Sequence, residues 1–230
     1  MSLNTLPPID QRISSWVELQ RQANKGSKEK YDVSITLSRE FGCEGYPLAL
    51  KLKEDLEAKW GGEWTIFDQL LIDKILSERQ ISAQLLANIG ERSKFLDTLI
   101  ASLNPRWKTD QDLYEIMVET IHSLAQKGRC IFVGRGAAVV TQDLKNCFHF
   151  RLEAPKEFRT GSLVKRLNLS PTEAEALIKT QENQREDFIN HFLGVDLSEM
   201  RYYHLKFNNA KIHKSEISKM MLQTIENFLS

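Results

Sequence analysis

Two periods of hydrophobicity alternate along most of the chain. Apolar and polar residues alternate over 33–38, which predicts a strand, whereas leucines recur every four residues over 48–56, which predicts a helix. The same patterns predict strands at 65–67, 131–133, 148–152 and 203–207 and helices over about 69–127, 156–192 and 217–225. Strands separated by helices pair in parallel, so the sequence predicts a three-layer α/β fold, a parallel sheet flanked by helices on both faces.

The first 30 residues depart from this pattern. Four apolar residues share one helical face after a Pro-Pro pair, namely Ile9, Ile13, Trp16 and Val17. Residues 24–30 are polar and predict a linker. We therefore expect a helical extension at 1–30 and one α/β domain at 31–230. We expect the extension to pack on the main body, with a dedicated partner helix as the alternative.

Composition narrows the function classes. Apolar residues make up 41% and charged residues 27% of the 230 residues, which is typical of a folded globular protein. The 31 basic and 31 acidic residues cancel, which argues against binding to nucleic acid. No apolar run approaches the ~18 residues of a membrane span, and no secretory signal opens the chain, so we expect a cytoplasmic protein without membrane contact. The sequence is compatible with a homo-oligomer.

Cysteine and histidine spacing gives no sign of a disulfide framework or a metal centre. The three cysteines lie far apart and form no C-x-x-C pair, and the five histidines include no H-E-x-x-H. We expect reduced cysteines and no metal held by protein ligands alone.

The turn after the first predicted strand is a candidate anion-binding loop. Two glycines lie three residues apart in the run Ser38-Arg39-Glu40-Phe41-Gly42-Cys43-Glu44-Gly45-Tyr46-Pro47. Glycine lets the backbone approach a phosphate, and the N-terminus of the following helix offers free N–H groups. The residues expected to contact a phosphate are Ser38, Arg39, Gly42, Cys43, Glu44, Gly45 and Tyr46. The alternative is a structural role, because any tight strand-to-helix turn favours glycine.

This loop departs from the G-x-x-x-x-G-K-[ST] pattern of a full phosphate-binding loop. The lysine of that pattern would fall at Gly45 or at Tyr46, depending on how the loop is aligned. In neither alignment does the loop have the lysine for the β- and γ-phosphates or the hydroxyl at the usual position for Mg²⁺. Arg39 would supply the missing positive charge. Glu44 would oppose it, because a carboxylate ~4 Å from a phosphate charge repels it by about 1 kcal/mol in water and about 4 kcal/mol at an effective dielectric of about 20. That repulsion disappears if the Glu44 side chain points away or holds a metal.

A second candidate site follows the buried strand predicted at 131–133. The run Gly134-Arg135-Gly136 puts an arginine at the end of that strand, where a guanidinium can grip a phosphate with two parallel hydrogen bonds. The flanking glycines would leave room for a ligand. The alternative is a structural salt bridge from Arg135 to a carboxylate such as Asp68 or Glu40.

Four segments resemble the cytidylate kinase-like family of P-loop nucleoside-monophosphate kinases, in this order: ITLSREFGCEGYPLA, TIFDQLLIDKI, CIFVGRGAAVV and FRLEAPKEFRTGSLVKRLNLS. The resemblance covers about residues 33–227. It implies a five-stranded parallel core, ATP–Mg²⁺ as donor, and phosphoryl transfer to a nucleoside monophosphate of the CMP or dCMP kind. It also implies acceptor contacts from Asp68, Gly134, Arg135 and Gly136. Gly136 stands where cytidylate kinases carry an aspartate that contacts the acceptor.

The resemblance also implies two accessory helical parts, a monophosphate-binding insert over about 68–108 and lid-like helices over about 156–192. Lid arginines neutralise the donor phosphates during transfer. With Arg39, the catalytic residues implied are Arg159 and Arg185. The alternative for each lid arginine is a solvated helix face.

Three functions are compatible with these residues. ATP-dependent phosphorylation of a nucleoside monophosphate, or of another small phosphorylated molecule, accounts for the arginines at both strand ends. A catalytically impaired nucleotide sensor accounts for Glu44, for Gly136, and for a lid without basic residues at Asn183 and Gln184. An interaction protein on a kinase fold would use the N-terminal helix as its contact and would not respond to nucleotides.

Overall fold

The computed structural model describes residues 32–68 and 110–230, and its elements follow the predicted alternation of strands and helices. The strands are β1 Ser34–Arg39, β2 Thr65–Phe67, β3 Cys130–Val133, β4 Cys147–Glu153 and β5 Leu205–Asn208. The helices are α2 Gly45–Trp60, α6 Asp110–Lys127, α7 Ala137–Val140, α8 Lys156–Leu167, α9 Pro171–Phe188 and α10 Lys214–Leu229, with a π-helix at Ile189–Leu193 and a 3₁₀ turn at Met200–Tyr202.

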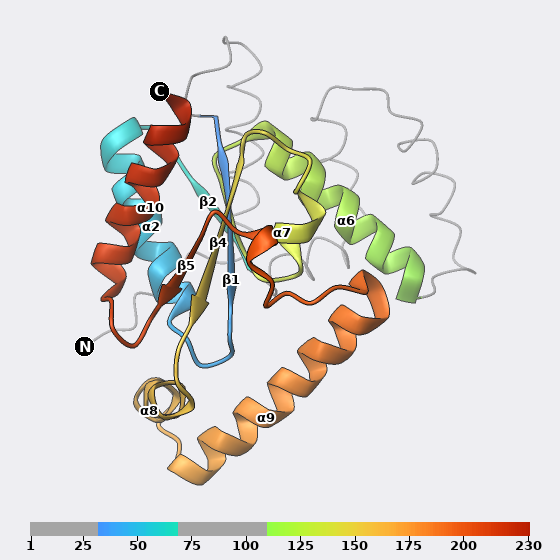
Figure 1. Ribbon diagram of the computed structural model, residues 1–230, viewed down its shortest axis with the longest axis vertical. Helices are drawn as coiled ribbons and strands as arrows, with labels where there is room; N and C mark the ends of the chain where they lie inside the picture. The colour runs from blue at the N-terminus through green and yellow to red at the C-terminus, as the bar shows by residue number, and fades with distance from the viewer. Residues whose placement is uncertain (1–31, 69–109) are drawn as a thin grey trace.

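The five strands form one sheet in the order β2-β3-β1-β4-β5, and all four pairings are parallel. β1 is central, with Ile35 opposite Ile131 of β3 on one side and Phe148 of β4 on the other. The predicted parallel α/β sheet is therefore confirmed. The carboxyl ends of the strands face α8 and α9 at the bottom of the view in Figure 1.

Helices cover both faces of the sheet, as predicted. α2 packs beside α10 on one face, and α6 and α7 lie against the other (Figure 1). The four-residue spacing of Leu48, Leu52 and Leu56 puts all three on the face of α2 that is fully buried in the core. On the opposite face of β1, the buried Thr36 hydroxyl hydrogen-bonds His149 of β4 across 2.9 Å.

The region predicted as helical over 156–192 is broken into two α-helices and a π-helix. Asn168 ends α8 in the left-handed conformation, and α9 restarts with Pro171 in its first turn. Ser170 caps α9 through a reciprocal pair of hydrogen bonds with Glu173, the capping box that the S-P-T-E run favours. At its far end α9 passes into the π-helix Ile189–Leu193.

The last predicted strand begins later than expected, and two predicted segments lie outside the described residues. Tyr203 was expected in the last strand, but β5 begins only at Leu205. Tyr203 instead packs as a buried side chain, and its hydroxyl donates to the Leu197 carbonyl across 2.8 Å. The expected extension at 1–30 and most of the expected insert lie outside the described residues. None of the helices described is long and apolar enough to cross a membrane.

Candidate functional site

The strand order puts the two predicted arginine loops next to each other. The chain leaves β1 toward β2 and leaves β3 toward β4, in opposite directions along the sheet, although β1 and β3 are neighbours. Such a reversal opens a crevice at the carboxyl ends of the strands, which is where open α/β sheets bind ligands. Arg39 ends β1, and Arg135 lies two residues beyond β3, so both arginines stand at this crevice.

The loop after β1 combines free and occupied backbone N–H groups. The Cys43 N–H donates to the Glu40 carbonyl at 3.2 Å, and the Glu44 N–H donates to Asn209 Oδ1 at 2.7 Å. No acceptor within the described residues takes the N–H groups of Phe41, Gly42 or Gly45. These three groups are therefore available to an anion.

Gly42 is required for the shape of this loop. Its φ is +93°, and a Cβ there would lie 2.7 Å from the Cβ of Arg159 on α8. Glycine therefore permits both the turn and the close approach of α8.

Arg39 is a partly buried guanidinium that has no hydrogen bond or ion pair to any residue the structure describes. It lies across Gly134, where a Cβ would overlap its Nη1. Burial, and after it the positive charges of Arg185 and Arg135, lower the pKa of Arg39 from 12.5 to about 10. Three arginines thus approach one another at the crevice, an arrangement that a bound anion would relieve.

A cavity of about 230 Å³ lies between this loop and α8. Six of the residues predicted from the sequence line it, namely Arg39, Gly42, Cys43, Gly45, Tyr46 and Asp68. Arg166 of α8 completes one wall. Glu44 is not among the residues that line this cavity.

The glycines around Arg135 do not leave open space, contrary to the reason given for them from the sequence. Gly134 makes room for the Arg39 guanidinium, and Gly136 makes room for Leu193, whose Cδ1 would lie 2.7 Å from a Cβ. The guanidinium carbon of Arg135 lies 5.9 Å from the centre of the Phe188 ring.

The two predicted lid arginines differ in how they are held. Burial lowers the pKa of Arg185 below its ordinary value, and the nearby charge of Arg151 contributes. No hydrogen-bond or ion-pair partner holds Arg185 within the described residues. Arg185 borders a second, larger cavity of about 550 Å³.

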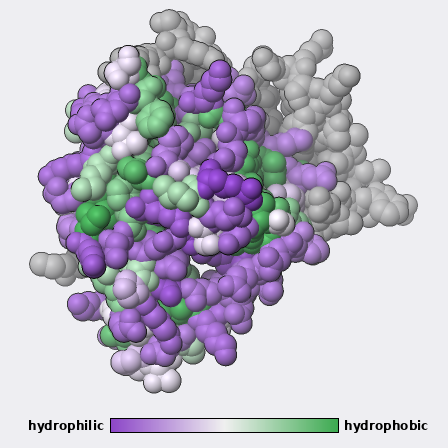
Figure 2. Space-filling model, in the orientation of Figure 1, coloured by the Kyte–Doolittle hydropathy of each residue, from purple (hydrophilic) through white to green (hydrophobic). Residues whose placement is uncertain are grey.

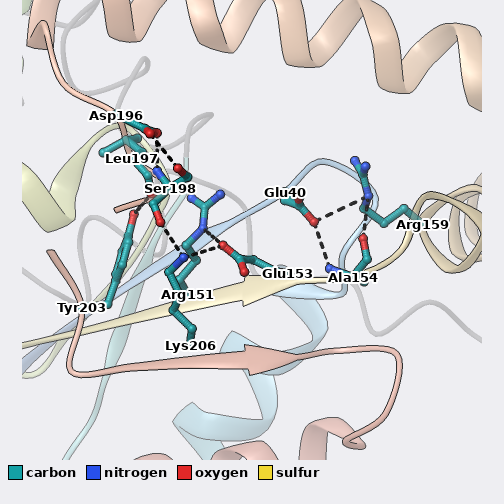
Figure 3. A network of polar contacts seen from close by, with 10 residues as sticks. All are labelled: Glu40, Arg151, Glu153, Ala154, Arg159, Asp196, Leu197, Ser198, Tyr203 and Lys206. Atoms are coloured by element: carbon teal, nitrogen blue, oxygen red, sulfur yellow. Dashed lines mark hydrogen bonds and ion pairs between the residues drawn. The ribbon is translucent and has the colours of Figure 1, made fainter. Parts of the chain in front are cut away.

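Arg159, in contrast, is buried and held through two of its three side-chain nitrogens. Its Nε donates to the Ala154 carbonyl at 3.1 Å and its Nη1 donates to the Phe41 carbonyl at 3.2 Å. Nη1 also pairs with Glu182 of α9. Nε lies 3.7 Å from Glu40, as Figure 3 shows. In this arrangement Arg159 ties the loop to both lid helices, and its catalytic role stays a prediction.

Three residues have roles at the site that were not predicted from the sequence. Glu40 accepts the Ala154 N–H at 2.9 Å and separates the two cavities, whose linings share it. Asn209, which holds the loop from 165 residues away, carried no local signal. Arg151 carried one, since it is a charged residue within the apolar strand run FHFRLE.

The residues present fit a phosphate chain better than they fit a metal. The loop supplies three free N–H groups and the Arg39 guanidinium. Among the described residues, no three His, Cys, Asp or Glu side chains come together as metal ligands. Mg²⁺ often binds with substrate phosphates and water as most of its ligands, so it would accompany ATP rather than occupy a site of its own.

Together, the parallel five-stranded sheet and the arginine-lined loop at its reversal point define a nucleotide kinase-like α/β fold. The model of the cytidylate kinase-like family matches residues 34–211, and the chain belongs to that family.

One solved structure at low sequence identity supports the fold alone. A search of curated proteins finds no match. A crystal structure of an uncharacterized protein from Eubacterium ventriosum is 20% identical, with a TM-score of 0.63, over 85% of this chain and 99% of that one. A chain from the PezAT chromosomal toxin–antitoxin system of Streptococcus pneumoniae is 14% identical, with a TM-score of 0.37, over 96% and 95%.

Proposed function

We propose that this protein transfers a phosphoryl group from ATP–Mg²⁺ to a nucleoside monophosphate of the CMP or dCMP kind, or to a similar small phosphorylated acceptor. The observation that carries the proposal is the Arg39 guanidinium, which borders the loop cavity and forms no ion pair with any described residue, although the charge of Asp68 in the same lining acts on it. Arg135 and Arg185 approach it from a second loop and from α9. Membership of the cytidylate kinase-like family also supports a kinase activity.

In this proposal the loop N–H groups and Arg39 hold the donor phosphates. Phosphoryl transfer depends mostly on positioning and on neutralising charge, so fixed guanidinium groups are suitable catalysts. Arg135 would contact the acceptor phosphate from the β3 end of the crevice. Arg185 would neutralise the charge that develops between the two phosphates.

A second function, nucleotide sensing without transfer, is favoured by two specific contacts. Asn209 already occupies the Glu44 N–H, and Arg159 is held by Glu182 and by the Phe41 carbonyl. Both contacts use hydrogen-bond donors that would otherwise be available to the phosphates of a bound nucleotide. A sensor would bind nucleotide saturably without forming product.

The experiment that separates these functions is product formation from ATP–Mg²⁺ with CMP, dCMP, UMP, AMP and GMP, resolved by chromatography. An Arg135→Ala variant exposes any contaminating host kinase. Arg201→Ala is the matched control, because Arg201 is exposed and its contacts among the described residues are with its near neighbours Glu199 and Tyr202. Diphosphate product that disappears in Arg135→Ala but persists in Arg201→Ala supports transfer. No product with any acceptor, together with saturable ATP binding, supports the sensor.

A further inference from the structure

The larger cavity contains a buried arginine that its protein partners do not satisfy. Arg151 projects from β4 and is 5% exposed, and its guanidinium borders the cavity of about 550 Å³. Its Nε donates to Glu153 Oε1 at 2.7 Å, but its Nη1 has no hydrogen-bond partner among the described residues. A buried, charged N–H without an acceptor is costly, so a ligand oxygen at this point would be strongly favoured.

Arg151 shares its carboxylate partner with a second cation, and its guanidinium carbon lies 5.7 Å from the centre of the Tyr203 ring. Glu153 Oε1 also accepts from Lys206 Nζ at 2.9 Å, so a single carboxylate serves two cations (Figure 3). Arg185 lines the same cavity and adds a third positive charge. Two guanidinium groups that face one cavity are the usual means of holding a phosphate.

The carboxylates that line the cavity already have partners, with one exception. Glu40 accepts the Ala154 N–H, and Glu182 pairs with Arg159. Both carboxylate oxygens of Asp196 accept from Ser198, from its N–H and its hydroxyl, each at 2.7 Å. The exception is Glu186, which is exposed on α9 and whose carboxylate has no hydrogen-bond or ion-pair partner within residues 32–68 and 110–230. These hydrogen bonds leave the carboxylates charged, so four carboxylates and two guanidinium groups line the cavity. The buried Arg151 marks its inner end, and the exposed Glu186 marks its mouth.

The outer wall suits hydroxyl groups rather than a nucleobase. Glu186 and Asn190 come from α9 and the π-helix, and Asp196 and Ser198 come from the segment opposite. None of the described residues that line the cavity is aromatic, so the cavity offers no ring on which a base could stack. Figure 2 shows this face of the molecule as largely hydrophilic.

We propose that the cavity between Arg151 and Arg185 binds a small phosphate monoester whose body carries hydroxyl groups, as a sugar phosphate does. The phosphate contacts the two guanidinium groups, and the hydroxyl groups hydrogen-bond the carboxylate and amide groups at the mouth. The volume is in the range of small-molecule sites. This site goes beyond the proposed function and shares only Arg185 and the Glu40 wall with the phosphate loop.

The test is calorimetric titration of the full chain with ribose 5-phosphate, with ribose, inorganic phosphate and CMP as comparisons. We expect ribose 5-phosphate to bind more tightly than ribose or inorganic phosphate. Arg151→Gln should weaken it at least about tenfold, the effect of losing a charge-assisted hydrogen bond. The matched control Arg201→Gln, which removes an exposed charge, should leave the affinity unchanged.

Three results would overturn the proposal: no binding of ribose 5-phosphate to the wild type, equal affinity in Arg151→Gln, or CMP binding at least about tenfold more tightly in an Arg151-dependent manner. If Arg151→Gln does not fold, the same titration of Asn190→Glu tests the proposal. This substitution places a further carboxylate on an exposed residue of the cavity and should also weaken ribose 5-phosphate, whereas an unchanged affinity contradicts the site. A parallel titration with ATP–Mg²⁺ separates this proposal from the proposed function, since either ligand can bind without the other.

Discussion

Replacing Arg39 with methionine should make the ligand-free protein more stable. Methionine keeps most of the aliphatic stem and removes the charge. The pKa of Arg39 falls from 12.5 to about 10, chiefly through burial and then through Arg185 and Arg135. At about 1.4 kcal/mol per pH unit, the folded state disfavours the charged form by about 3 kcal/mol. Allowing for lost packing, we expect the free energy of unfolding of Arg39→Met to rise by about 1–3 kcal/mol.

Urea unfolding followed by tryptophan fluorescence measures this gain. For a domain of this size, about 2 kcal/mol also corresponds to a rise in melting temperature of about 4–8 °C. Arg39→Lys, which keeps a charge at the site, is the control and should show no comparable gain.

The pH dependence of the gain has a definite sign. The folded pKa of Arg39 is depressed, so the penalty is fully present below about 10 and is relieved as the pH rises from about 10 toward 12.5. The difference between variant and wild type should therefore shrink above pH 10. A variant less stable than wild type by more than about 1 kcal/mol would refute the reasoning, because Arg39 would then be held by favourable partners.

Three further predictions concern the surroundings of the site. Arg159→Leu should lower the free energy of unfolding, measured in urea, by about 2–4 kcal/mol, because it leaves Glu182 and the Phe41 carbonyl without their partner. A loss below about 1 kcal/mol would contradict the inference that Arg159 ties the loop to both lid helices. Burial and then His204 lower the pKa of His149 to about 4, so stability should fall by up to about 3 kcal/mol between pH 6.5 and 4, where the unfolded chain takes the proton first. That slope should flatten in His149→Gln, and an unchanged slope would assign it to other groups. Burial raises the pKa of Cys43 to about 12, so its thiol should react with a maleimide at pH 8 only on unfolding; rapid labelling of the folded chain, detected by peptide mass, would contradict this.

The sequence could predict those parts of the fold that depend on local pattern. Hydrophobic period located every described strand, and the glycine spacing located the loop at Gly42 and Gly45. The start of β5 was misplaced because Tyr203 continues the alternation, although its hydroxyl is satisfied by the Leu197 carbonyl rather than by a strand partner.

The remaining features depend on contacts between distant residues. The resemblance to the kinase family implied a lid role for Arg159, but it could not show that Glu182 and the Phe41 carbonyl contact its guanidinium. It also could not show that Asn209 holds the loop. Arg151 was not predicted as a site residue because the sequence does not show which residues face a charged side chain in an apolar strand.

The central claim is that Arg39 is the cation of an anion site at the carboxyl ends of β1 and β3. The most direct test is calorimetric titration of ATP–Mg²⁺ into wild type and Arg39→Met, at matched salt, with Arg201→Met as the charge control. The account predicts saturable binding to the wild type and the control, and affinity at least about tenfold weaker in Arg39→Met. Equal affinity in all three proteins, or no binding to the wild type, would contradict it.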